Sequence, residues 1–136
     1  MLRAETKTRA RALQMLYAWD LKGRPPMSLV ARRMPPDGLG LRQRASAGKL
    51  AAAVARDIGG LDRDIADAAH NWRFERIGVV ERNILRLGLH ELMNLDLPAP
   101  VAIDEAVKLA HWFAGPKAPG FVNGVLDALA RRLGRL

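Results

Sequence analysis

Basic side chains near the N-terminus are the first residues whose type and spacing suggest a chemistry. Arg3, Lys7 and Arg11 are four residues apart, so they would share one face of a helix. Arg9 lies among them, and Gln14 adds a side chain that can hydrogen-bond to a base edge. Cationic side chains neutralise phosphates, so the segment predicts a phosphate-binding surface. A solvated helix face is the alternative for any one of these cations alone.

A second candidate surface lies in the segment Lys117-Ala-Pro-Gly-Phe-Val-Asn-Gly124. A glycine turn there would deliver Phe121 and backbone N–H groups to the start of a helix. Helix N-termini attract phosphates, and an aromatic ring can stack on an unpaired base. The alternative is a helix cap in which Phe121 is a hydrophobic lid.

Motifs that would indicate catalysis are incomplete. His90-Glu91-Leu-Met-Asn94 begins like the helical zinc-protease signature, but Asn94 stands where the second histidine ligand belongs. Gly115-Pro-Lys-Ala-Pro-Gly120 has the glycine spacing of a phosphate loop, but Phe121 replaces the lysine that reaches the phosphates. The chain has no cysteine, and its three histidines lie far apart in the sequence. We therefore expect no enzyme, no metal site and no cofactor.

The charge of the chain is unevenly distributed. The 136 residues carry a net charge of +8, with 49% hydrophobic and 26% charged residues, as in a soluble single domain. Residues 1–49 hold 11 Lys or Arg against three acidic residues, whereas residues 50–136 hold 11 of each sign. An electropositive region on a neutral body predicts a nucleic-acid partner or, less often, an anionic membrane, with an arginine-rich coding bias as the alternative. No apolar run reaches the roughly 18 residues of a membrane span, so we expect a cytoplasmic protein without a membrane partner.

Helical periodicity dominates the chain and predicts an all-α fold of six or seven helices. The expected helices are Thr8–Leu21, Met27–Arg33, Leu39–Ile58, Leu61–Trp72, Ile77–Leu95, Val101–Phe113 and Phe121–Leu133.

Three details of these helices carry further expectations. Gly59-Gly60 should close the third helix. Apolar residues on two sides of Ile77–Leu95 predict a central helix, and Gly88 within it predicts a close helix crossing. Because Leu13 and Leu16 should point inward, at least one of the neighbouring Tyr17 and Trp19 should face outward.

Four segments carry a resemblance to a known protein family. They are Ala12-Leu-Gln-Met-Leu-Tyr-Ala-Trp19, Arg82-Asn-Ile-Leu-Arg-Leu-Gly-Leu-His-Glu-Leu92, Val101-Ala-Ile-Asp-Glu-Ala-Val-Lys-Leu-Ala110 and Phe121-Val-Asn-Gly-Val-Leu-Asp127. The first two are similar to the first and the central helix of the NusB family of bacterial transcription antitermination factors, and the last two resemble its two most distinctive segments. The match leaves out only about residues 22–46.

The resemblance implies a single RNA-binding domain over residues 1–136, built from two small three-helix bundles at about 1–72 and 76–136. NusB proteins pair with NusE, a ribosomal small-subunit protein, and together they bind single-stranded boxA RNA. The pair joins elongating RNA polymerase and suppresses termination, especially on ribosomal RNA operons. We therefore expect NusE and boxA-type RNA as direct partners and RNA polymerase as an indirect one.

The resemblance also assigns residues. Lys7 and Arg9 fall within the family's arginine-rich RNA-binding segment, which Glu5, Thr6 and Thr8 dilute in this chain. Tyr17 and Glu81 match positions associated with the NusE contact. Together with the two candidate surfaces, the predicted RNA-binding set is Arg3, Lys7, Arg9, Arg11, Lys117, Gly120, Phe121 and Asn123.

Two other interpretations stay open. The RNA-binding domain in front of ribosomal RNA cytosine methyltransferases shares the implied fold, but those enzymes need catalytic cysteines and a cofactor-binding domain. A helical protein–protein adaptor or a homodimer, with its basic face merely solvated, belongs to a different class of function.

Overall fold

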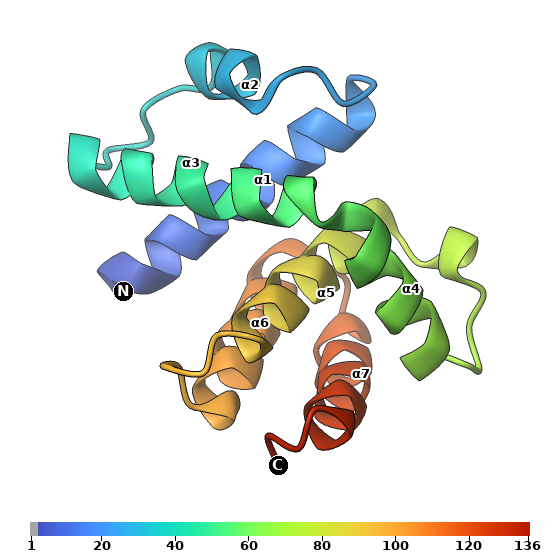
Figure 1. Ribbon diagram of the computed structural model, residues 1–136. Helices are drawn as coiled ribbons and strands as arrows, with labels where there is room; N and C mark the ends of the chain where they lie inside the picture. The colour runs from blue at the N-terminus through green and yellow to red at the C-terminus, as the bar shows by residue number, and fades with distance from the viewer. Residues whose placement is uncertain (1–2) are drawn as a thin grey trace. The chain divides into compact units, whose positions relative to one another are not determined.

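The computed structural model describes residues 3–136, which form seven α-helices and one short 3₁₀ helix without any strand. The predicted all-α fold is therefore confirmed. The chain forms two compact units, the first ending at Arg56 and the second running from Asp57 to Leu136 (Figure 1). This division comes earlier than the expected boundary at residues 72–76, because the helix that precedes Trp72 packs against helices of the second unit.

Unit 1 holds α1 (Ala4–Leu21), α2 (Met27–Arg33) and α3 (Leu41–Arg56), and each of the three contacts the other two. The helix α1 ends where Gly23 and Arg24 adopt positive φ angles of 76° and 62°, just before two prolines. The core of this unit contains one large ring, that of Trp19, among mostly smaller side chains: Ala12, Leu13, Met15, Leu16, Val30, Ala47, Ala51 and Val54.

Two helix limits in unit 1 differ from expectation. The helix α1 begins at Ala4 instead of Thr8, so that Lys7 and Arg11 lie within it and Arg3 precedes its first turn. The helix α3 ends at Arg56, and the expected break at Gly59-Gly60 is wrong. The chain breaks at Asp57 instead, and both glycines lie in the first turn of the next helix.

Unit 2 holds α4 (Ile58–Ala68), the 3₁₀ helix η1 (Phe74–Arg76), α5 (Val79–Leu92), α6 (Ala99–Phe113) and α7 (Ala118–Arg132). The helix α5 contacts α4, α6 and α7, which confirms its predicted central place. Its core is dominated by larger aliphatic side chains: Leu61, Ile65, Ile84, Leu85, Leu87, Leu89, Leu92, Leu109, Leu126 and Leu129. With α4 included, this unit has four α-helices where three were expected.

Gly88 lies at the predicted close crossing. A Cβ atom at this position would lie 2.6 Å from Cδ1 of Leu126 on α7 and 3.4 Å from Cβ of Ala106 on α6. Only a glycine lets the three helices approach this closely without displacing a core side chain.

A buried arginine links α4 to α5. The Nε and Nη2 atoms of Arg86 donate to the two carboxylate oxygens of Asp62 at 2.6 and 2.8 Å, and Nη1 donates to Oδ1 of Asn83 at 2.9 Å. The Nδ2 atom of Asn83 donates in turn to the Val79 carbonyl at 3.0 Å. This bidentate geometry satisfies a cation that is only 1% exposed.

Arg135 closes the far end of α5. Its guanidinium donates hydrogen bonds to the carbonyl oxygens of Leu92, Asn94 and Leu97, which lie at the end of α5 and in the loop before α6. The last carbonyls of a helix lack hydrogen-bond donors within the helix, and here the guanidinium provides the donors.

Candidate nucleic-acid interface

The basic edge of α1 lies beside a polar hollow. Arg3 and Lys7 are exposed and Arg9 is half-buried. Lys7, Arg11 and Gln14 line a hollow of about 310 Å³, with Asp37 and Gly38 on its other side. Cations and hydrogen-bonding groups from one helix face therefore meet around a space that a polar ligand can enter.

Arg11 differs from the other cations of this segment. It is only 5% exposed, and its Nη1 atom donates to the Pro35 carbonyl at 2.6 Å and pairs with the Asp37 carboxylate at 3.4 Å. This guanidinium therefore ties α1, through its Nη1 atom, to the loop between α2 and α3.

The two aromatic side chains on α1 separate as expected. Trp19 is 7% exposed and belongs to the core, whereas Tyr17 is 41% exposed. Tyr17 is thus the ring that a partner can reach.

The start of α7 differs from the predicted glycine turn. The helix begins at Ala118, so Gly120 and Phe121 already lie in its first turn. The Ala118 N–H bonds to the Gly115 carbonyl, Pro119 has no N–H, and the Phe121 N–H bonds to the Lys117 carbonyl. Three of the first four residues of this helix therefore offer no free N–H, and a phosphate site built on this helix start is not supported.

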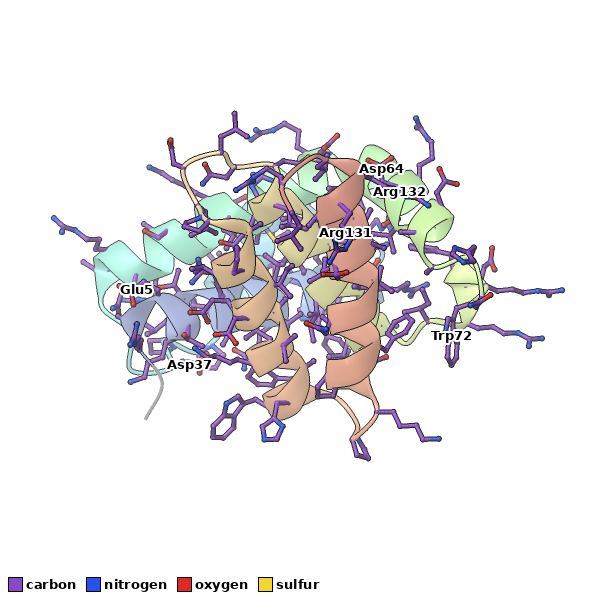
Figure 2. All side chains as sticks on the ribbon, turned by 90° about the horizontal axis from the view of Figure 1, so that it is seen from below. Glu5, Asp37, Asp64, Trp72, Arg131 and Arg132 are labelled. Atoms are coloured by element: carbon purple, nitrogen blue, oxygen red, sulfur yellow. The ribbon has the colours of Figure 1, made fainter. Side chains whose placement is uncertain are left out.

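Phe121 instead lines a pocket in unit 2. The pocket has a volume of about 450 Å³ and a mainly apolar lining that includes Trp72, Arg76, Ile77, Glu81, Lys117 and Phe121. The rings of Trp72 and Phe121 meet edge to face, with centroids 5.4 Å apart and an angle of 67° between the planes. Trp72 is 58% exposed, and Figure 2 shows it projecting from the loop after α4. Two cations, one carboxylate and two aromatic rings thus surround one concave surface.

Local structure fixes the wall of this pocket. The Trp72 N–H bonds to the Ala69 carbonyl, and buried Ile77 anchors the other end of the loop. Between them, Phe74 lies beneath two guanidinium groups, those of Arg82 at 5.7 Å and Arg86 at 5.9 Å. The loop that carries Trp72 is therefore held against α5.

The remaining predicted residues lie at different places. Glu81, assigned to the partner contact, lies in the same pocket as Lys117 and Phe121, with its carboxylate folded over Gly78. Asn123 instead lines a separate hollow between α6 and α7. Gly120 is exposed, and a Cβ atom there would meet nothing within 4 Å.

Sequence reasoning missed Trp72 and Arg76. Trp72 was expected to end a helix, but α4 ends at Ala68 and leaves the ring in a loop. The available signal was a large aromatic side chain within the polar segment His70-Asn-Trp-Arg-Phe-Glu-Arg76, where core packing does not require one.

Two further searches cover residues 3–136. Within this range no three His, Asp or Glu side chains are grouped as a metal ion requires. None of the described helices combines the length and apolarity that crossing a membrane requires.

Comparison with known proteins identifies the family of this chain. The model of the NusB family matches residues 6–131. The transcription antitermination protein NusB of Sorangium cellulosum is 43% identical, over 98% of this chain and 96% of the relative. That of Solibacter usitatus is 36% identical, over 93% of this chain and 88% of the relative.

A solved structure extends the similarity to three dimensions. It contains the antitermination factors NusB and NusE in complex with double-stranded RNA, and its matching chain is 32% identical with a TM-score of 0.80. The match covers 97% of this chain and 99% of that one. Sequence and fold agree, and the chain belongs to the NusB family.

Proposed function

We propose that this chain is a transcription antitermination factor that binds single-stranded boxA-type RNA together with NusE. It acts by binding, without catalysis, on the cytoplasmic elongation complex of RNA polymerase, and it favours processive transcription of ribosomal RNA operons. Family membership supports this function, and the similar solved complex contains NusE and RNA, there in double-stranded form.

The observation that carries the proposal is the pocket around Trp72 and Phe121. Stacking of a base on an aromatic ring requires an accessible ring, and Trp72 provides one beside Phe121. The exposed side chains of Lys117 and Arg76 lie on the same lining and can neutralise the phosphates on either side of the base. An unpaired nucleotide therefore fits the pocket in shape and in charge, whereas a base stacked within a duplex cannot enter it.

The basic edge of α1, in unit 1, is a separate proposed surface for RNA. Arg3, Lys7 and Arg9 supply phosphate contacts along one helix, and Gln14 supplies a hydrogen-bonding edge over the hollow. We assign Arg11 mainly to holding the loop between α2 and α3 in place. Gly120 and Asn123 remain proposed contacts, since each is exposed on α7.

Tyr17 and Glu81 form the proposed NusE contact. Glu81 lines the RNA pocket, so we infer that NusE lies against RNA bound there and strengthens its binding. In this arrangement Tyr17→Asp lowers NusE affinity, and RNA affinity falls only when NusE is present. Fluorescence anisotropy with labelled RNA, with and without NusE, measures both effects. A folded Tyr17→Asp variant with full NusE affinity would contradict the assignment.

The function is tested by titrating the protein, alone and with NusE, with three RNAs of equal length. These are a single-stranded boxA-type RNA, its scrambled sequence and its duplex. We expect the single strand to bind best and NusE to increase its affinity. Equal affinity for all three RNAs, with and without NusE, would overturn the proposal and favour a protein–protein adaptor.

The pocket is tested by a matched pair of tryptophans. Trp72→Ala removes the stacking surface and should lower RNA affinity about 5- to 150-fold, because stacking on an aromatic side chain contributes about 1–3 kcal/mol per base. Trp112→Ala is the control, because Trp112 is 62% exposed on α6 and does not line the pocket. Equal losses in the two variants would exclude a specific role for the pocket.

A further inference from the structure

The proposed RNA site leaves a large basic segment unused. Residues 21–56 contain eight Lys or Arg and a single acidic residue, Asp37. Asp37 is paired with Arg11 on α1, so its charge is already compensated. An arginine-rich coding bias does not explain the imbalance, because residues 57–136 hold ten Lys or Arg against eleven acidic residues.

Three of these cations lie in one line. Arg42, Lys49 and Arg56 are each seven residues apart on α3, which brings them to nearly the same angle around the helix, about 10 Å apart along its axis. That angle is opposite to the face through which Ala47, Ala51 and Val54 enter the core. All three cations are exposed, and among the described residues none of them makes a hydrogen bond or an ion pair.

The side chains between these cations are small. Ala45, Ser46 and Ala53 occupy the intervening turns of the same face. A helix that lies in a membrane surface needs large apolar side chains beside its cations, and a protein interface needs aromatic or large aliphatic anchors. A phosphate backbone needs neither, and small neighbours let it approach the helix closely.

We propose that Arg42, Lys49 and Arg56, here called the α3 stripe, bind phosphates of single-stranded RNA outside the boxA-type sequence. The α3 stripe offers charge but almost no hydrogen-bonding groups that could distinguish bases, so this contact is independent of sequence. The inference rests on the proposed RNA-binding function and adds a second contact to it. Its role is to increase the affinity and the association rate for long transcripts.

The experiment compares two RNAs. One is a short boxA-type single strand, and the other carries the same sequence with unrelated single-stranded extensions on both sides. In the native protein the extensions should increase affinity roughly tenfold at 50 mM salt. Three phosphate contacts, each with a slope near −0.7 on single strands, should weaken this extra binding roughly 18-fold between 50 and 200 mM salt, so the gain should disappear at 200 mM.

The variant that tests the proposal is Arg42→Gln/Lys49→Gln/Arg56→Gln. It should bind the short RNA like the native protein but lose the gain from the extensions. The control is Arg63→Gln/Lys108→Gln/Arg131→Gln, which changes the net charge equally on exposed or half-buried positions of α4, α6 and α7. Thermal unfolding followed by circular dichroism checks that both variants keep the native fold.

Each outcome separates the two proposals. If the native protein fails to bind the short RNA specifically, the proposed function fails. If it binds but the extensions add nothing, or both triple variants lose the gain equally, the α3 stripe proposal is overturned. A stripe variant that keeps the gain but loses binding to phosphatidylserine-containing vesicles would overturn it in favour of a membrane surface.

Discussion

Each unit buries one arginine, and the two arginines are used differently. Arg86 in unit 2 engages both carboxylate oxygens of Asp62 and the amide oxygen of Asn83. Arg11 in unit 1 bonds to one carbonyl and meets Asp37 at 3.4 Å, and its buried Nε atom has no partner among the described residues. The carboxylate of Asp37 is also more exposed than that of Asp62, at 38% against 23%.

This difference matches the division of charge between the units. Residues 1–56 hold twelve Lys or Arg against three acidic residues, for a net charge of +9, whereas residues 57–136 have a net charge of −1. Unit 2 combines a large aliphatic core with a saturated polar network and a shaped aromatic pocket. Unit 1 has a smaller core and presents charge. We infer that unit 1 supplies general affinity for RNA and unit 2 supplies shape selectivity.

The substitution with the largest expected effect on stability is that of Arg86. Arg86→Met should lower the free energy of unfolding by about 3–5 kcal/mol, because it leaves the Asp62 carboxylate and the Asn83 amide without their partner. Urea unfolding followed by circular dichroism measures the change, and Arg131→Met on the surface of α7 is the control. A loss below about 1 kcal/mol would remove the contrast between the two buried arginines.

Gly88 in α5 and Gly48 in α3 should respond to alanine in opposite directions. Gly88→Ala should destabilise unit 2 by about 1–2 kcal/mol, because overpacking against Leu126 outweighs the better helix propensity of alanine. Gly48→Ala should stabilise unit 1 by up to about 1 kcal/mol, because a Cβ there only touches Cε of Met15 at 4.0 Å. The same urea titrations measure both changes, and equal signs would show that the two helix crossings are packed alike.

Arg11→Met should lower the free energy of unfolding by only about 1 kcal/mol. Its partners Pro35 and Asp37 are exposed, so water can bind them in place of the guanidinium. Comparing the stability and the RNA affinity of this variant therefore distinguishes a structural role of Arg11 from a role in binding RNA. Urea unfolding measures the stability, and anisotropy measures the RNA affinity. A variant of native stability with strongly reduced RNA affinity would make Arg11 a phosphate contact instead.

The smallest expected effect is on the salt dependence of RNA affinity. Lys7→Gln should weaken RNA binding a few-fold and make the slope of log affinity against log salt shallower by about 0.7, as expected for one lost phosphate contact. Trp72→Ala should lower affinity and leave the slope unchanged, since stacking releases no counterions. Titrations at four salt concentrations give both slopes. Equal slopes for the two variants would contradict the inference that unit 1 binds RNA through its charge and unit 2 through the shape of its pocket.

The sequence predicted what depends on local periodicity. The helices, the central place of α5 and the close crossing at Gly88 follow from apolar spacing and from the cost of a glycine inside a helix. Helix limits were less accurate, since Gly59 and Gly60 are tolerated in a first turn and Pro119 fits the start of α7.

The site was predicted only in part, because its shape depends on residues far apart in the chain. Lys117 and Phe121 were identified from a local motif, but Trp72 and Arg76 join them only through the packing of a distant loop. The burial of Arg11 depends likewise on Pro35, which lies 24 residues later in a loop. Spacing within one helix cannot reveal such partners.

The contacts of Arg135 bear on the order in which the protein folds during synthesis. The carbonyls at the end of α5 receive their guanidinium only after residue 135 has been made, 43 residues after Leu92. All residues of unit 1 are translated before unit 2 begins, and domains generally fold as units from the N-terminus during synthesis. Unit 1 is therefore fully translated while the last carbonyls of α5 in unit 2 still lack the guanidinium of Arg135. A released chain that ends after residue 132 should accordingly have a unit 2 that is more sensitive to proteases than that of a chain that includes Arg135.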